Sequence, residues 1–169
     1  LEPDPVTRLG EAFAATVAPV TAGNDPCLAV QFAAEFGDDR SLAAIAHGLD
    51  GIGLPVVLFR AGAAPWHDDL AVYARLAQRL RVPASLFESL DVREIARLIA
   101  SSRGFVGSSL HARIVAAAFG RPCLSLERTA GAGRKLRAYL DTWLPGETVW
   151  SPEGFADAGP ALLVPRAAG

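Results

Sequence analysis

The sequence predicts a doubly wound α/β fold with a parallel central sheet, because short apolar runs alternate with amphipathic helical patterns from residue 27 onward. These short runs are apolar along their whole length, which is typical of parallel strands covered on both faces. Right-handed crossovers between successive strands then place helices on both sides of the sheet. The chain has 169 residues, enough for one such domain with its own core. We therefore expect a three-layer, Rossmann-like sheet with strand order 3-2-1-4-5.

Each element follows from its local pattern. The strands are expected at residues 27–32, 54–60, 83–87, 103–107 and 121–126, and the helices at 4–19, 38–49, 66–80, 91–101, 109–119 and 132–143. After residue 143 the chain is rich in Pro, Gly and Ala, and it either adds an edge strand near 148–150 or wraps over the sheet. We therefore divide the chain into an N-terminal helix and linker (1–26), the Rossmann-like domain (27–145) and a C-terminal edge strand or tail (146–169).

Helical spacing also predicts which side chains face the sheet. They are Leu42, Ile45, Ala46 and Leu49; Leu70, Tyr73, Ala77 and Leu80; Val92, Ile95, Leu98 and Ile99; and Leu136, Tyr139, Leu140 and Trp143. Both cysteines, Cys27 and Cys123, lie in strand-like runs and are expected to be buried thiols.

Composition narrows the function classes. Apolar residues make up 51% of the chain and charged residues 20%, as in soluble globular proteins. A net charge of −2 argues against broad binding to nucleic acid. No Cys/His cluster with zinc-ligand spacing, no long apolar run and no signal peptide occur, so we expect no metal site and a cytoplasmic location. The sequence contains no methionine, even at position 1, and is expected to be part of a longer protein.

The segment Gly107–His111 is the strongest candidate site, because ligands of such folds bind beyond the carboxyl ends of the strands. Gly107 ends a predicted strand, and Ser108 or Ser109 can cap the next helix. The free amides at that helix start favour a phosphate or carboxylate. His111, on the first turn, can donate a hydrogen bond or exchange a proton. The alternative is a capped helix with an incidental histidine; burying a histidine in an apolar helix without a partner is costly, which favours function.

Three further loops carry polar residues at the same predicted edge. After the second strand, His67 is followed by Asp68 and Asp69; one aspartate can cap a helix, and His67 can be oriented as a base. After the first strand, Gly37 allows close approach of the backbone to a ligand. After the fifth strand come Glu127 and Arg128, a glycine-rich turn at 129–133 and then Arg134 and Lys135. Arg128 and Lys135 are cations able to face an acidic ligand; an ordinary flexible loop is the alternative.

With these residues in view, the chain resembles the polysaccharide pyruvyl transferase family from about residue 27 to about residue 143. The resemblance rests on LIASSRGFVGSSLHARIVAAAFGRPCLSL (98–126), on the HDD segment (67–69) and on Lys135. It implies a two-domain protein of glycosyltransferase-B type, of which this chain is the carboxyl-terminal half that binds phosphoenolpyruvate. Gly107–Ala112 corresponds to the family segment Gly-(Thr/Ser)-Arg-Leu-His-(Ala/Gly). Ser109 therefore replaces an arginine implied to grip the anion, and that contact would move to Arg103, Arg113, Arg128 or Lys135.

The resemblance implies a reaction that attaches pyruvate to a sugar as a ketal. His111 is then the general acid or a donor to the phosphate, and His67, Asp68 or Asp69 orients or deprotonates a sugar hydroxyl. Substrate and anion contacts are expected from Gly107, Ser108, Ser109, Leu110, Gly37, Asp69, Glu127, Arg128 and Lys135.

The resemblance also implies a bacterial enzyme of exopolysaccharide biosynthesis. Its substrates would be phosphoenolpyruvate and a saccharide acceptor, with no cofactor. The acceptor domain is expected before residue 1, so this chain would bind donor but turn over poorly or not at all. Peripheral association with membrane-bound synthesis machinery is a further expectation.

Two other functions remain open. One is the donor domain of a nucleotide-sugar glycosyltransferase; many of these carry two glutamates eight positions apart, whereas Lys135 stands eight positions after Glu127. The other is a non-catalytic Rossmann-like module retained for assembly with partners. A dinucleotide enzyme is disfavoured, because the first predicted strand is not followed by Gly-x-Gly-x-x-Gly.

Overall fold

The computed structural model describes residues 26–62, 67–129, 131 and 133–162, so the helix predicted at 4–19 lies outside the described residues. The elements in chain order are β1 (Leu28–Gln31), the 3-10 helix η2 (Ala34–Phe36), α2 (Asp39–Ile52), β2 (Val56–Phe59), α3 (Leu70–Ala77), β3 (Ala84–Phe87), α4 (Val92–Ser101), β4 (Gly104–Gly107), α5 (Leu110–Ala118), β5 (Cys123–Leu126), α6 (Arg134–Trp143), β6 (Val149–Trp150) and α7 (Pro152–Leu162). The strands form one parallel sheet of order β3-β2-β1-β4-β5-β6. The predicted fold class and strand order are confirmed.

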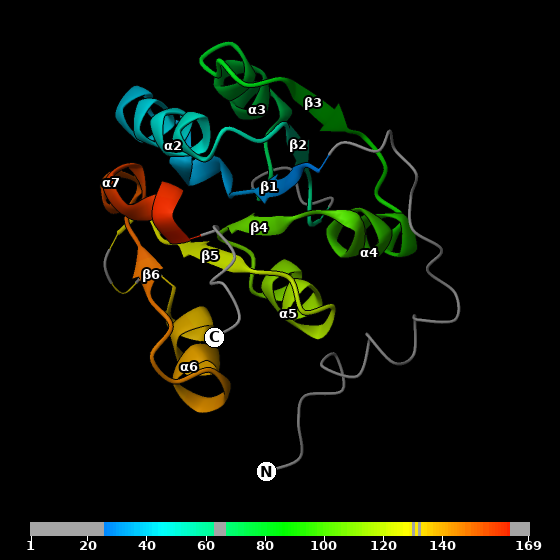
Figure 1. Ribbon diagram of the computed structural model, residues 1–169, viewed down its shortest axis with the longest axis vertical. Coiled ribbons are helices and arrows are strands. Elements are labelled where there is room, and N and C mark those ends of the chain that lie inside the picture. Colours follow the sequence, from blue (N-terminus) through cyan, green and yellow to red (C-terminus); the bar gives the residue numbers. More distant parts are fainter. Residues whose placement is uncertain (1–25, 63–66, 130, 132, 163–169) are drawn as a thin grey trace.

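Helices cover both faces of this sheet (Figure 1). On one face, side chains of α2, α3 and α7 such as Ile45, Tyr73 and Phe155 pack against alternate strand residues. On the other face, Ile99 of α4 and Ala116 of α5 pack with the intervening strand residues. A third cluster joins α5 to α6. Side chains alternate between the two faces of each strand, so the central strands β1, β2 and β4 are buried on both faces and consist mainly of apolar residues.

Side-chain caps fix where several helices begin. Asp38, Asp69, Asp91 and Ser109 cap α2, α3, α4 and α5, each accepting a hydrogen bond from an amide of the following first turn. These caps lie at the carboxyl edge of the sheet, where the predicted polar loops are. The polar composition of these loops therefore reflects helix capping as well as any binding role.

The inward faces predicted for α2 and α6 agree with the structure, with Trp143 only half-buried. The prediction that Leu70 and Val92 face the sheet is wrong, because Leu70 is 40% exposed and Val92 is 73% exposed. Each is the first residue of its helix, directly after the capping aspartate, where the helix does not yet lie against the sheet. Cys27 and Cys123 are free thiols and half-buried rather than buried. Burial raises the pKa of the Cys27 thiol and raises that of Cys123 to about 11.

The C-terminal segment both adds an edge strand and wraps over the sheet, the two alternatives that the sequence left open. It adds β6 to the edge of the sheet and then forms α7, which packs along α2. Phe155 of α7 is fully buried and lies against Gly48 of α2. Among the described residues, no helix is long and apolar enough to cross a membrane.

Candidate functional site

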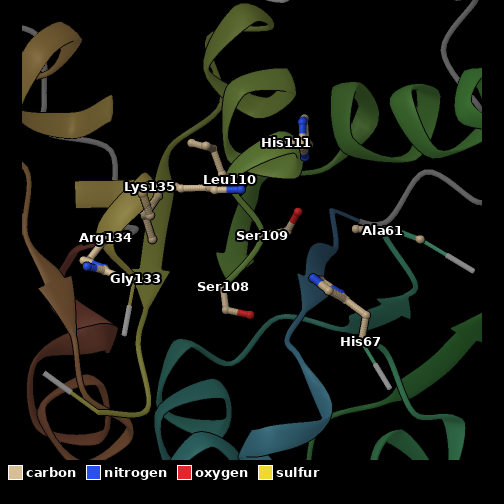
Figure 2. Close-up of a pocket in the computed structure, with 11 residues that line it drawn as sticks. Ala61, His67, Ser108, Ser109, Leu110, His111, Gly133, Arg134 and Lys135 are labelled. Atoms are coloured by element: carbon tan, nitrogen blue, oxygen red, sulfur yellow. The ribbon is translucent and has the colours of Figure 1, made fainter. Parts of the chain in front are cut away.

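A pocket of about 590 Å³ opens at the carboxyl edge of the sheet, between the loop after β2, the start of α5 and the start of α6 (Figure 2). It is lined by Ala61, Gly62, His67, Ser108, Ser109, Leu110, His111, Gly133, Arg134, Lys135 and Leu136. His67 lies on one side, Arg134 and Lys135 lie on the other, and the two serines lie between them. The pocket adjoins the β1–β4 pair, where strand order reverses, which is the place that doubly wound folds use for ligands.

Gly107 allows β4 to approach β1 closely at this edge. Its Cα pairs with that of Gln31, and a Cβ on Gly107 would lie 2.0 Å from the Gln31 carbonyl oxygen. The Ser108 amide donates to that same carbonyl at 3.1 Å, and the Ser108 Oγ accepts from the Ala33 amide at 3.0 Å. A glycine at 107 is therefore required for the geometry that carries both serines into the pocket.

Ser109 is the cap of α5, and its Oγ accepts from the Ala112 amide at 3.3 Å. Its own amide donates to the Gln31 side chain at 3.0 Å. Among the described residues, no hydrogen-bond partner is found for the amides of Leu110 and His111. Both residues line the pocket at the start of α5, which is the positive end of the helix dipole. Ser109, at the position where the resemblance implies an arginine, is thus a helix cap that orders the start of α5.

His111 lines the pocket from the first turn of α5 and is exposed. The argument from the cost of burying this histidine is therefore wrong, because its ring reaches solvent. The buried charge of the helix is instead Arg113, which is 2% exposed. What supports a role for His111 is its place in the pocket lining, on the first turn of α5.

The sequence offers four cations that could replace the anion contact of the family's arginine: Arg103, Arg113, Arg128 and Lys135. Among these described residues, only Lys135 lines the pocket. Its side chain extends from the start of α6 toward the start of α5 (Figure 2). Arg113 is buried and donates to the Cys123 carbonyl and to Ser125 Oγ at 3.1 and 3.2 Å. Arg128 pairs with Asp38 at 3.0 Å. Arg103 lies at the amino end of β4, the opposite edge of the sheet.

His67 is held by the neighbouring carboxylate, which is itself hidden from the pocket. His67 Nδ1 lies 3.0 Å from Asp68 Oδ1; the His67 side chain is 52% exposed and that of Asp68 is 0% exposed. The other partners of Asp68 are Gln31 Nε2 at 2.7 Å and the Ala61 and Gly62 amides at 2.7 and 3.3 Å. Because Asp68 is fully enclosed by these groups, it cannot touch a substrate, contrary to a directly catalytic role.

Three other predicted site residues have structural partners outside the pocket. Asp69 caps α3, accepting from the Ala71 amide at 2.8 Å. Gly37 packs under α3, where a Cβ would lie 2.7 Å from Val72 Cγ2, so its missing side chain serves helix packing rather than ligand approach. Arg128 forms the ion pair with Asp38 described above.

Glu127 lines a smaller pocket of about 150 Å³ that shares His67, Ser108, Gly133 and Leu136 with the larger one. Its buried carboxylate forms an ion pair with Arg137, with Arg137 Nε at 3.0 Å. The Arg137 guanidinium, and then the amides of Gly131 and Gly133, hold the pKa of Glu127 below its ordinary value although burial opposes them. Glu127 therefore shapes the loop before α6.

Sequence reasoning did not single out Gln31, Ala61, Gly62 or Arg134 as site residues. Gln31 had a visible signal, a polar residue that ends an otherwise apolar strand. Ala61 and Gly62 contribute through backbone amides, which side-chain chemistry does not reveal. Among the described residues, no cluster of three or more His, Cys, Asp or Glu side chains could hold a metal ion.

The sheet order and the pocket at its reversal point define a glycosyltransferase-B-like α/β domain with a candidate ligand pocket beside a helix start. A glycosyltransferase involved in avilamycin A biosynthesis, AviGT4, is similar in fold, with a TM-score of 0.53 and 17% sequence identity. The match covers 89% of this chain and 43% of that chain, so the chain spans less than half of its structural neighbour. No curated protein matches the sequence. The family model of the polysaccharide pyruvyl transferases matches residues 18–129, and the chain belongs to this family.

Proposed function

We propose that this chain is the phosphoenolpyruvate-binding half of a polysaccharide pyruvyl transferase that attaches pyruvate to a sugar of a cell-surface polysaccharide as a ketal. The observation that carries the proposal is the convergence on one pocket of two free helix amides, His111, Arg134 and Lys135. Phosphoenolpyruvate carries a phosphate and a carboxylate, and both suit amides and cations at a helix start. Membership of the polysaccharide pyruvyl transferase family supports this reaction class.

In the proposed reaction, C3 of phosphoenolpyruvate gains a proton and becomes a methyl group. Two sugar hydroxyl oxygens bond to C2, and the bond from C2 to the phosphate-bearing oxygen breaks, so that inorganic phosphate leaves. Of the two hydroxyl protons released, one balances the proton given to C3 and the other leaves with phosphate. The chemistry needs an acid near C3 and a base near the hydroxyls.

The pocket offers a residue for each task. His111, beside the free amides of α5, is the acid or the donor to the leaving phosphate. His67, on the opposite wall, is the base that takes a hydroxyl proton. Lys135 and Arg134 neutralise the carboxylate and the phosphate. We propose that a second domain facing this edge of the sheet holds the acceptor sugar; the structural neighbour is longer than this chain, which covers 43% of it.

Donor binding can be tested with this chain alone by calorimetry. Phosphoenolpyruvate should bind the unmodified chain, and Lys135→Ala and His111→Ala should each weaken binding by about 10-fold or more, as expected when one charge-assisted hydrogen bond is lost. Arg93→Ala is the matched control, because it removes an exposed cation from α4, away from the pocket. Absence of binding of both phosphoenolpyruvate and phosphate to the unmodified chain would overturn the proposal.

A nucleotide-sugar donor is the competing function, favoured by the fold of the structural neighbour. Nucleoside diphosphates titrated under the same conditions separate the two, because tighter binding of a nucleotide than of phosphoenolpyruvate supports the competitor. Lys135 is the only lysine in the sequence, so reductive methylation with labelled formaldehyde marks one side chain besides the N-terminal amine. A donor-induced shift of that signal would place the anion beside α6.

A further inference from the structure

Gln31 links the two sides of the pocket from beneath. It ends β1, the middle strand at this edge, and its side chain is fully buried. Its Nε2 donates to Asp68 Oδ1 at 2.7 Å, and its Oε1 accepts from the Ser109 amide at 3.0 Å. These bonds join residues 37 and 78 positions apart in the chain. The loop that carries His67 and the start of α5 are therefore connected through one amide group.

The network fixes the orientation of that amide. If the Gln31 amide were reversed, its oxygen would face the Asp68 oxygen and its NH2 group would face the Ser109 N–H, so both bonds would be lost. Asp68 in turn acts only as an acceptor: Oδ2 accepts from the Ala61 and Gly62 amides, and Oδ1 accepts from Gln31. Every group that contacts these two oxygens, apart from the His67 ring, is thus an N–H donor.

These constraints determine which nitrogen of His67 carries the proton. Nδ1 lies 3.0 Å from Asp68 Oδ1, an acceptor, so in the neutral ring Nδ1 must be the donor. Nε2 is then unprotonated. The half-exposed ring lines both pockets, so Nε2 is the ring nitrogen left to meet a ligand.

We infer that Asp68 is a positioning residue, backed by Gln31, which holds His67 with Nδ1 protonated and Nε2 open toward the pocket as a proton acceptor. The role of Nε2 as the base toward a sugar hydroxyl rests on the proposed function; the tautomer itself does not. Asp68 acts only through His67, because no part of its side chain reaches the pocket.

The tautomer is measurable by nitrogen-15 spectroscopy of the ring nitrogens at mildly alkaline pH, where histidine rings are neutral. The chain has three histidines, and a His67→Gln variant identifies the His67 signals by their loss. The unmodified chain should show His67 with a protonated Nδ1 and an unprotonated Nε2. A His67 ring protonated at Nε2 in the folded, unmodified chain would overturn the inference without any variant at the positioning residue.

Asp68→Asn gives the sharper test, because it is close to isosteric. The asparagine oxygen would still accept from the two backbone amides of Ala61 and Gly62, which turns its NH2 group toward His67 and gives up the single bond from Gln31 Nε2. Nδ1 must then accept, and the ring should switch to the Nε2-protonated form. Asp69→Asn is the matched control, since it makes the same change at the adjacent helix cap and should leave the His67 tautomer unaltered.

A folded Asp68→Asn variant that keeps the original tautomer would contradict the inference. A switch in Asp69→Asn as well would contradict it too, because the effect would then follow from lost charge rather than from the hydrogen bond. These outcomes are independent of donor binding. A correct tautomer in a chain that binds no phosphoenolpyruvate would refute the proposed function while leaving the role of Asp68 intact.

Discussion

Single residues set the geometry of the pocket, and Gly107 is the most constrained of them. A Cβ at this position would meet the Gln31 carbonyl oxygen at 2.0 Å and the Phe105 ring at 2.7 Å. The carbonyl belongs to the central strand and cannot move without breaking the ladder. We expect Gly107→Ala to destabilise the fold by about 1–3 kcal/mol through overpacking, measured by urea unfolding, and to weaken phosphate binding.

Gly62 provides the control for this prediction. It lies on the same pocket, but a Cβ there meets nothing within 4 Å. Gly62→Ala should therefore leave stability unchanged or raise it by about 0.4–1 kcal/mol, because alanine restricts the unfolded chain. Equal losses in the two variants would show that the close approach of β1 and β4 is not the cause.

At the scale of elements, the sequence predicts the strands and the first five described α-helices because their apolar residues recur with a clear period. It does not predict α7, whose segment contains Pro152, Gly154, Gly159 and Pro160 and reads as a tail. That helix is stabilised by tertiary packing on α2, beside which it lies in Figure 1. Local propensity is a weak guide where a partner surface decides the outcome.

The contact of α7 with α2 should therefore contribute strongly to stability. Phe155 is 0% exposed to solvent, and a Cβ on Gly48 would lie 2.5 Å from its ring. We expect Phe155→Ala to lower the free energy of unfolding by about 3–5 kcal/mol. Val92→Ala, at a side chain that is 73% exposed, should change it little.

A double-mutant cycle tests whether the ring and the glycine are matched. Gly48→Ala alone should destabilise, because the ring must move, whereas in a Phe155→Leu background the same change should cost less. Additive effects of the two substitutions would indicate that α7 reaches stability without this close contact. Urea unfolding of the four proteins provides the comparison.

At the scale of the whole molecule, the sequence locates the edge of the sheet that carries the pocket but not the bonds beneath it. The sequence predicts the start of α5 from helix-start chemistry, and Lys135 from its charge beside a glycine-rich turn; both are local signals. The Asp68 network joins loops distant in sequence, and its members could equally have been caps, as Asp69 is. Such choices depend on three-dimensional register, which one sequence does not display.

Carboxylates that accept hydrogen bonds also determine how the molecule responds to acid. Hydrogen bonds from Ser41, and then the Arg128 guanidinium, hold the pKa of Asp38 well below its ordinary value. Burial of Asp50 acts to raise its pKa, but the amides of Val82 and Arg81 outweigh it, so the pKa is lowered. The Arg137 guanidinium lowers the pKa of Glu127 as well.

A lowered folded-state pKa means that each carboxylate contributes stability that is present above its unfolded-state pKa, about 4, and lost as the pH falls through the folded-state value. The urea midpoint should therefore be flat from neutral pH to about 5 and fall steadily below that. Asp50→Asn should lower the midpoint at neutral pH and make the acid slope shallower, because this carboxyl joins α2 to the turn after α3. Asp157→Asn, at an exposed carboxylate of α7, should leave the slope unchanged. A slope that is the same in the Asp50→Asn variant and the unmodified chain would show that the acid response arises elsewhere.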